Sequence, residues 1–181
     1  MDLLEITFED IRHSTHRYYT DFLTLYLNSF PEAERREVSQ VANILERDDS
    51  PFQIDAIRLR DRFVGFISHW KLSTYRYLEH FAIHPDMRSF GIGGRAMSSF
   101  IHQHTEPLLL EVEPMEDELT TRRVRFYESL GYVLRDTPYI QPAYREGGDT
   151  VPLLLMTHRF EADPTEQELT ELRTVVYGAK Y

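Results

Sequence analysis

The stretch HFAIHPDMRSFGIGGRAM, residues 80–97, decides how this chain folds. It begins as an apolar run that stops at Pro85, continues through Arg88, and places three glycines where a helix should start. The three are Gly91, Gly93 and Gly94. Glycine costs about 1 kcal/mol relative to alanine inside a helix, so a bare backbone must serve a purpose there. Because N–H groups at a helix N-terminus attract anions, the stretch predicts an anion-binding loop that opens a helix.

Two other glycine-rich loops fit the stretch less well. A P-loop needs Lys and then Ser or Thr after its last glycine, whereas Arg95 and Ala96 follow Gly94. A dinucleotide-binding loop needs G-x-G-x-x-G or G-x-G-x-x-A early in a strand–helix–strand unit. Gly91, Gly93 and Ala96 meet that pattern, but the strands before them read as antiparallel hairpins. A nucleotide-binding protein therefore stays the weaker alternative.

Composition limits the class of protein. The chain has 181 residues, 41% of them hydrophobic, which suits one domain with a sizeable core. It has no cysteine, no basic and apolar leader segment, and no apolar run long enough to span a bilayer, so we expect a cytoplasmic protein without membrane contact. The net charge of -10 argues against nucleic-acid binding and favours a cationic small substrate, although solubility explains most of it.

Hydrophobic periodicity and turn residues predict a mixed sheet with helices on both faces. We expect strands over 3–10, 52–60, 62–73, 76–84, 107–113, 132–137 and 151–160. We expect helices over 14–30, 32–48, 93–104, 119–131 and 164–177. A Ser or Thr near residue 14 should cap the first helix, and Asp163 the last, with Pro164 in its first turn. The loop 141–150 carries Gly-Gly at its tip.

Two segments together resemble the GNAT superfamily of acetyl-CoA-dependent N-acetyltransferases. In AIHPDMRSFGIGGRAM, Arg88, Gly91 and Gly93 match the motif R-x-x-G-x-G, and FYESLGY follows about 35 residues downstream, after one more strand. The resemblance implies an α/β (α+β) fold with a mixed, mostly antiparallel sheet of about seven strands, helices on both faces, and splayed fourth and fifth strands. It covers a single domain, 1–181, with a core of about 3–158 and an extra C-terminal helix.

The same resemblance implies a site for acetyl-CoA. The pantetheine arm would bind the backbone of the strand before the loop, and the loop would hold the pyrophosphate at the helix N-terminus. The residues implied are Phe81, Ala82 and Ile83 on the strand, Arg88, Ser89, Phe90, Gly91, Ile92, Gly93 and Gly94 in the loop, and Phe126. Family members often carry Asn and Ala where this chain has Thr120 and Arg123, which puts the second side of the arm's site in doubt.

Acetyl transfer to an amine needs an acid for the leaving thiolate and a route for the amine's proton. Tyr127 matches the family's acid, although it could instead be a packed aromatic residue. Glu79 is the candidate base on the strand that would present the acetyl group, but a solvated acid or a substrate contact would explain it equally well. His80 has the better intrinsic pKa and should point to the opposite face unless a bulge intervenes. A water chain could also replace a single base.

The acceptor side is less well defined. Glu34 lies in the segment NSFPEAERRE, residues 28–37, at the start of the second predicted helix, and could meet a cationic amine or simply complement a helix dipole. Glu111 is an acid inside an apolar strand, so it should either face the cleft or pair with a base such as Arg123. Tyr144 could line the site from the loop 141–150. The acceptor itself is expected to be a primary amine of a small molecule or peptide.

Three further expectations concern partners. The eight histidines show no metal-ligand spacing, so no metal site is predicted. The last helix could cover its own sheet or that of a second copy, and the resemblance makes a homodimer possible. A CoA-binding regulatory module with the same fold and no turnover is the alternative to an enzyme.

Overall fold

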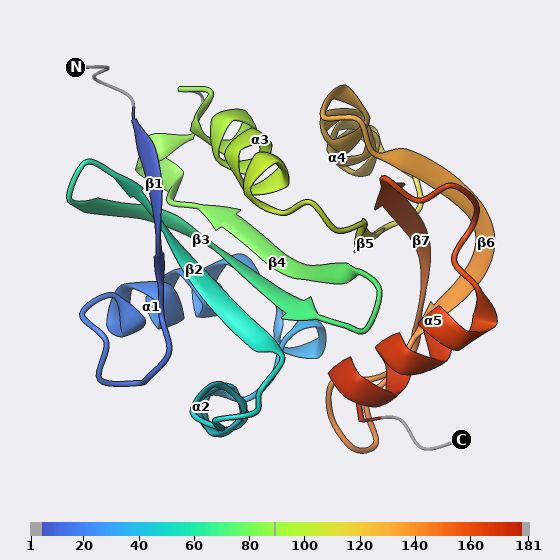
Figure 1. Ribbon diagram of the computed structural model, residues 1–181, viewed down its shortest axis with the longest axis horizontal. Helices are drawn as coiled ribbons and strands as arrows, with labels where there is room; N and C mark the ends of the chain where they lie inside the picture. Colours follow the sequence, from blue (N-terminus) through green and yellow to red (C-terminus); the bar gives the residue numbers. More distant parts are fainter. Residues whose placement is uncertain (1–4, 89, 179–181) are drawn as a thin grey trace. The chain divides into compact units, whose positions relative to one another are not determined.

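The computed structural model describes residues 5–88 and 90–178 (Figure 1). The strands are β1 (Ile6–Asp10), β2 (Phe52–Leu59), β3 (Arg62–Lys71), β4 (Arg76–Ile83), β5 (Leu108–Val112), β6 (Val133–Gln141) and β7 (Val151–His158). The α-helices are α1 (Tyr19–Ser29), α2 (Val38–Leu45), α3 (Ile92–Gln103), α4 (Glu118–Ser129) and α5 (Glu166–Glu171). Hydrogen bonds order the strands β1-β2-β3-β4-β5-β7-β6 in one mixed sheet of seven strands. The predicted fold class is therefore confirmed.

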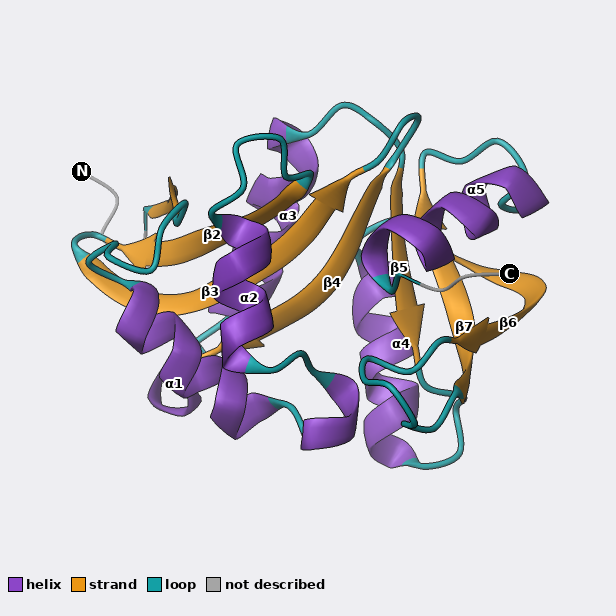
Figure 2. Cartoon of the chain, turned by 90° about the horizontal axis from the view of Figure 1, so that it is seen from below, coloured by secondary structure: helices purple, strands orange, loops and turns teal. Residues whose placement is uncertain are grey.

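One compact unit contains residues 5–70 and 79–105 of the described chain. Here β1 pairs antiparallel with β2, and β2 with β3. Helices α1 and α2 lie on one face of these strands and α3 lies on the other, as Figures 1 and 2 show from two directions. Aromatic rings fill the α1 side, where Phe22 meets Phe66 edge to face with ring centroids 4.8 Å apart. This packing holds α1 against β3, the neighbour of β4, and β4 leads into the glycine-rich loop.

A second compact unit contains residues 71–78 and 106–178. Its part of β4, Arg76–Leu78, pairs parallel with Leu108–Leu110 of β5, although β4 runs on to Ile83. Such a short pairing is what the expected splay of the fourth and fifth strands requires. Strand β7 pairs antiparallel with β5 and with β6, and α4 and α5 lie on opposite faces of these strands (Figures 1 and 2).

The first helix begins later than predicted. It starts at Tyr19, and no side chain caps it. The Ser14 hydroxyl and backbone N–H instead donate to Glu46 Oε1, at 2.5 Å and 2.8 Å. The second predicted helix is also shorter, because a single 3₁₀ turn over Glu32–Glu34 precedes α2. A contact between segments distant in the sequence thus takes Ser14 away from capping α1, whereas α2 begins with a local capping box of Glu37 and Gln40.

The last helix is capped by a different residue from the one predicted. Thr165, and not Asp163, is the N-cap, and its side chain exchanges hydrogen bonds with Glu168 in a capping box. The helix continues from α5 as a π-helical turn over Leu172–Val176. The side chains that it buries within the chain are Leu169, Leu172 and Val176, so the helix covers the strands of its own unit. None of the described helices is long and apolar enough to cross a membrane.

Candidate active site

The glycine-rich loop links β4 to α3 within the first unit. After Ile83, the chain makes a 3₁₀ turn over Pro85–Met87 and reaches Gly91, which is the N-cap of α3. Gly91 has a φ of +70°, in the left-handed region that costs other residues about 1–2 kcal/mol. Arg88 Nε donates to the Ile83 carbonyl at 3.0 Å, so this side chain ties the loop back to the end of β4. This contact supports a role for Arg88 in orienting the loop.

The first turn of α3 offers the bare backbone that the sequence predicted. Its N–H groups, from Ile92, Gly93 and Gly94, precede the first helical hydrogen bond, which Arg95 makes to the Gly91 carbonyl at 3.2 Å. A Cβ added at Gly94 would meet nothing within 4 Å, and one at Gly93 would only touch the Phe81 and Ile83 side chains, at 3.7 Å and 3.6 Å. The fold itself would therefore accept a Cβ at either position.

The other predicted loop residues differ in exposure. Ile92, the first residue of α3, is buried, whereas Phe90 is 66% exposed. Ala82 and Ile83 are buried in β4, and Phe81 is partly buried beside them. Ser89 lies outside the described residues. The structure thus brings the described strand and loop residues of the predicted acetyl-CoA site together in one unit.

Glu79 is a buried, ion-paired carboxylate. Its side chain is 1% exposed, pairs with Arg36, and accepts a hydrogen bond from Trp70 Nε1 at 2.9 Å. Burial alone would raise the pKa of Glu79, but the charge of Arg36 and the hydrogen bonds overcome that effect and lower the pKa to about 2. Arg36 is itself buried, with its guanidinium 5.1 Å from the centre of the Trp70 ring. Sequence reasoning missed this partner, which lies 43 positions away.

His80 packs against the same segment as Glu79. Its Nε2 lies 2.9 Å from the Glu34 carbonyl oxygen and its Nδ1 lies 3.3 Å from Ser68 Oγ. The rings of Tyr26 and Phe30 enclose the imidazole, with centroids 5.1 Å and 4.5 Å away. His80 is therefore a structural residue of the core. His80 does not point away from Glu79, because its Nδ1 lies 3.8 Å from Glu79 Oε2.

Tyr127 lies on α4, in the second unit. Its ring is 8% exposed and packs against Phe126 and Tyr132, with centroids 5.1 Å and 5.5 Å apart. Burial raises the pKa of Tyr127 to about 12, so its hydroxyl carries a proton at neutral pH. One turn from the start of α4, Thr120 completes a capping box with Asp117. That local role explains the polar residue where family members often carry Asn.

Glu111 lies among tyrosines in the second unit. Its Oε2 accepts hydrogen bonds from Gln141 Nε2 at 2.5 Å and from the Tyr177 hydroxyl at 2.8 Å. Burial raises the pKa of the Glu111 carboxyl, against the opposing effect of these donors. Tyr144 joins the group through its ring, 5.2 Å from that of Tyr177. Arg123, considered as a partner for Glu111, pairs with Glu113 instead.

Glu34 ends the 3₁₀ turn before α2 and is exposed. Its backbone carbonyl, rather than its carboxylate, makes the contact to His80. The next residue, Arg35, donates from Nε to the Phe30 carbonyl at 3.0 Å. These bonds hold the turn against β4 and leave the Glu34 side chain at the surface of the first unit.

Comparison with known proteins agrees with this arrangement. The sequence model of the Acetyltransferase (GNAT) family matches residues 9–132, while no curated protein matches the sequence. A solved structure from Bacteroides thetaiotaomicron, described as a GNAT-family acetyltransferase, is 33% identical, with a TM-score of 0.87 over 96% of this chain and 99% of that one.

Two more distant structures share the fold. A GNAT-family acetyltransferase from Elizabethkingia anophelis, solved with acetyl-CoA bound, is 14% identical, with a TM-score of 0.57 over 88% of this chain and all (100%) of that one. Naa50 from Arabidopsis thaliana, solved with the bisubstrate analogue CoA-Ac-MVNAL, is 16% identical, with a TM-score of 0.59 over 86% of this chain and 99% of that one.

Proposed function

Because this chain belongs to the GNAT acetyltransferase family, we propose that it transfers an acetyl group from acetyl-CoA to a primary amine of a small molecule or peptide. The amine nitrogen attacks the acetyl carbon directly, in a complex that holds both substrates. The carbon–sulfur bond breaks, the thiolate gains a proton, and the amine loses one. The observation that carries this proposal is the glycine-rich first turn of α3, whose backbone the fold leaves bare.

We assign the binding of acetyl-CoA to β4 and the loop. The backbone of Phe81, Ala82 and Ile83 would hydrogen-bond the pantetheine arm in the way that an added strand does. The N–H groups at the start of α3 would hold the pyrophosphate, helped by the helix dipole. The left-handed conformation of Gly91 and the hydrogen bond from Arg88 to Ile83 support this assignment, since both fix the course of the loop backbone.

We assign Tyr127 as the acid that protonates the leaving thiolate. Its place in FYESLGY matches the family motif, and its raised pKa keeps the hydroxyl protonated where a donor is needed. We assign Glu79 as the negative charge that favours loss of the amine's proton. A carboxylate with a pKa of about 2 is a weak base, so this proton would leave through water rather than by direct abstraction.

We assign the acceptor side to Glu34, Glu111 and Tyr144. An ammonium group suits a carboxylate surrounded by aromatic rings, since both the charge and the ring faces attract cations. The Tyr177 hydroxyl donates to Glu111, and the Tyr144 ring packs against that of Tyr177. The peptide portion of the analogue bound to Arabidopsis Naa50 supports peptide amines as one acceptor class to test.

Titration calorimetry with acetyl-CoA, followed by thiol release with polyamines, aminoglycosides, amino acids and peptides, tests the proposal. We expect binding, and thiol release that depends on one amine class. Binding without release for any amine would replace the enzyme with a CoA-binding module that has no turnover. A protein that does not bind acetyl-CoA would contradict the assignment of the loop.

A further inference from the structure

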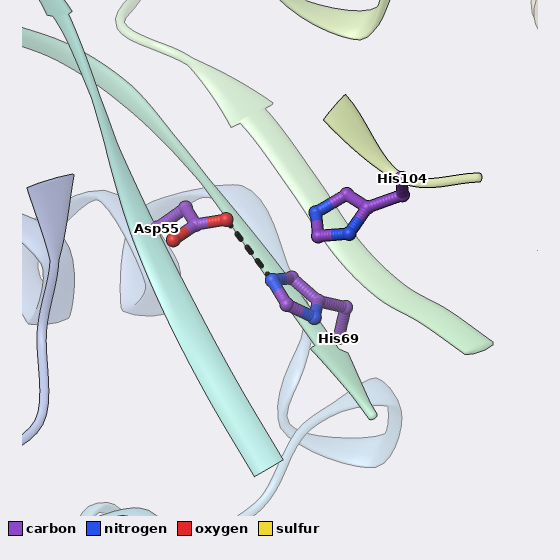
Figure 3. A group of neighbouring side chains, drawn as sticks. All are labelled: Asp55, His69 and His104. Carbon is purple, nitrogen blue, oxygen red and sulfur yellow. Dashed lines mark hydrogen bonds and ion pairs between the residues drawn. The ribbon is translucent and has the colours of Figure 1, made fainter. Parts of the chain in front are cut away.

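Three potential metal ligands from distant parts of the sequence meet on one side of the first unit (Figure 3). Asp55 comes from β2, His69 from β3, and His104 from the C-cap of α3. Each offers one ligand atom, and the three atoms lie within 4.8 Å of one another. His69 Nε2 and Asp55 Oδ2 are already 3.0 Å apart. We propose that these residues bind a divalent transition-metal ion, with Zn²⁺ the best match.

The donor set supports this choice of metal. Two imidazole nitrogens and one carboxylate oxygen are ligands that Zn²⁺ prefers, and three protein ligands leave a fourth position for water. Ligand atoms around a four-coordinate Zn²⁺ at bond lengths of about 2.1 Å are about 3.4 Å apart. Small rotations of the side chains would therefore bring the group, now within 4.8 Å, to binding distance.

The surroundings also favour a cation. The side chain of His69 is 2% exposed and that of Asp55 is 16% exposed, so an ion there would be largely shielded from water. The Phe100 ring lies 5.1 Å from His69 and 4.4 Å from His104, and it restricts the positions of both imidazoles. Because His104 caps the C-terminus of α3, the negative end of the helix dipole adds to the charge of Asp55.

Asp55 and His69 form an ion pair, and the rings of His69 and His104 lie 5.6 Å apart. Binding by all three would tie β2 and β3 to the end of α3 opposite the glycine-rich loop. The ion would thus stabilise the helix whose other end we assign to acetyl-CoA. This structural role does not depend on the proposed acetyl transfer.

Metal binding can be measured on the full-length protein after treatment with a chelator. We expect one equivalent of Zn²⁺ to bind by calorimetry and to raise the Tm, because a ligand that binds only the folded state stabilises it. Co²⁺ should give the intense visible absorption of a low-coordinate site. His104→Ala and Asp55→Asn should each weaken Zn²⁺ binding by about tenfold or more, while their Tm without metal stays near that of the original protein.

His102→Ala is the matched control, since His102 is exposed and lies two positions earlier on the same helix. It should bind Zn²⁺ as the original protein does. Equal Zn²⁺ affinity in His104→Ala, Asp55→Asn and the original protein would overturn the proposal, as would absence of Zn²⁺ binding to the original protein. The Co²⁺ spectrum of the original protein supplies a test that needs no variant. Weak visible absorption, which is typical of octahedral Co²⁺, would also contradict the proposed four-coordinate site.

Discussion

Two neighbouring tyrosines differ in what their hydroxyl groups can do. Tyr127 and Tyr132 are both buried and their rings are in contact, yet only Tyr127 matches the position of a catalytic acid. The Tyr132 hydroxyl is buried and has no hydrogen-bond partner among residues 5–88 and 90–178. Removing the Tyr132 hydroxyl should therefore not lower the free energy of unfolding. Tyr132 thus serves as a control for the effect of removing a buried hydroxyl group.

Tyr127→Phe should lower kcat by about tenfold or more, because the leaving thiolate loses its proton donor. Tyr132→Phe should leave kcat unchanged and should not lower the Tm. Steady-state kinetics at saturating substrates, together with thermal unfolding of both variants, makes the comparison. An unchanged kcat in Tyr127→Phe would show that another group protonates the thiolate.

Glu79→Gln should destabilise the fold by about 3–5 kcal/mol, since it leaves the buried Arg36 charge without a counter-charge. Glu113→Gln is the matched control, because its pair with Arg123 is about half exposed and contributes about 1 kcal/mol or less. Urea unfolding measures both values. A loss of less than about 1 kcal/mol in Glu79→Gln would mean that the pair contributes no more than a surface pair.

The same pair predicts how stability depends on pH. The folded-state pKa of Glu79 is about 2, below the ordinary value of 4.5, so its stabilising effect is complete above about pH 4.5. That effect is lost as the pH falls from 4.5 toward 2. The free energy of unfolding of the original protein should therefore drop more steeply over this range than that of Glu79→Gln. Parallel curves would contradict a lowered pKa.

Individual residues show what local sequence patterns can predict. The left-handed conformation of Gly91 follows from a motif within a few positions of it, and the sequence predicted a bare backbone there. The partners of Glu79 and Glu111 lie on other elements, and nothing near them in the sequence indicates which residues these are. The paired arginines at 35 and 36 look alike in the sequence, but only Arg36 is buried against β4.

At the scale of elements, most strands and both ends of α3 and α4 were predicted to within two or three residues. The start of α1 and the end of β6 were not, since α1 begins at Tyr19 rather than at 14 and β6 runs to Gln141 rather than to 137. Strands β2, β3 and β4 contain β-branched and aromatic residues between clear turns, and Arg60 adopts the left-handed conformation that a tight turn requires. Helix ends depend on single hydrogen bonds, for which Ser, Thr and Asp compete. Ser14 binds Glu46 rather than capping α1, which no local pattern would reveal.

The cap of α5 gives a prediction at this scale. Thr165→Ala should destabilise the protein by about 1 kcal/mol, because the side chain accepts from the Glu168 N–H. Asp163→Ala should change stability by less than about 0.5 kcal/mol, since Asp163 is half exposed and lies 3.4 Å from Arg135. Chemical unfolding of both variants decides between the two caps. A larger loss for Asp163→Ala would favour the cap predicted from the sequence.

At the scale of the whole molecule, the order of elements was predictable and the side-chain clusters were not. Periodicity and turn residues are local signals, and they give the order of strands and helices that the sheet then confirms. The Asp55, His69 and His104 cluster joins three elements, so ligand spacing along the sequence gave no sign of it. Only pairing of β2 with β3 and the packing of α3 bring such residues together.

The net charge of -10 belongs to the whole molecule and should attract a cationic substrate. We expect kcat/KM for a cationic amine to fall as ionic strength rises from about 0.01 M to about 0.15 M, because the screening length shortens from about 30 Å to about 8 Å. An uncharged acceptor analogue should show a smaller change. Equal salt dependence for the charged and uncharged acceptors would mean that the field of the protein does not guide the substrate.

The affinity of Gly93→Val for acetyl-CoA tests the central claim most directly. A Cβ at this position fits beside the Phe81 and Ile83 side chains, and the methyl groups of valine would crowd the start of α3, where the loop is proposed to meet the pyrophosphate. Thermal unfolding first establishes that the variant is folded. Ser99→Val, on the same helix but outside the loop, is the control. Calorimetry should show a Kd raised by about tenfold or more, which is about 1.4 kcal/mol or more, in Gly93→Val alone. An unchanged Kd in a folded Gly93→Val protein would contradict the assignment of this loop to acetyl-CoA.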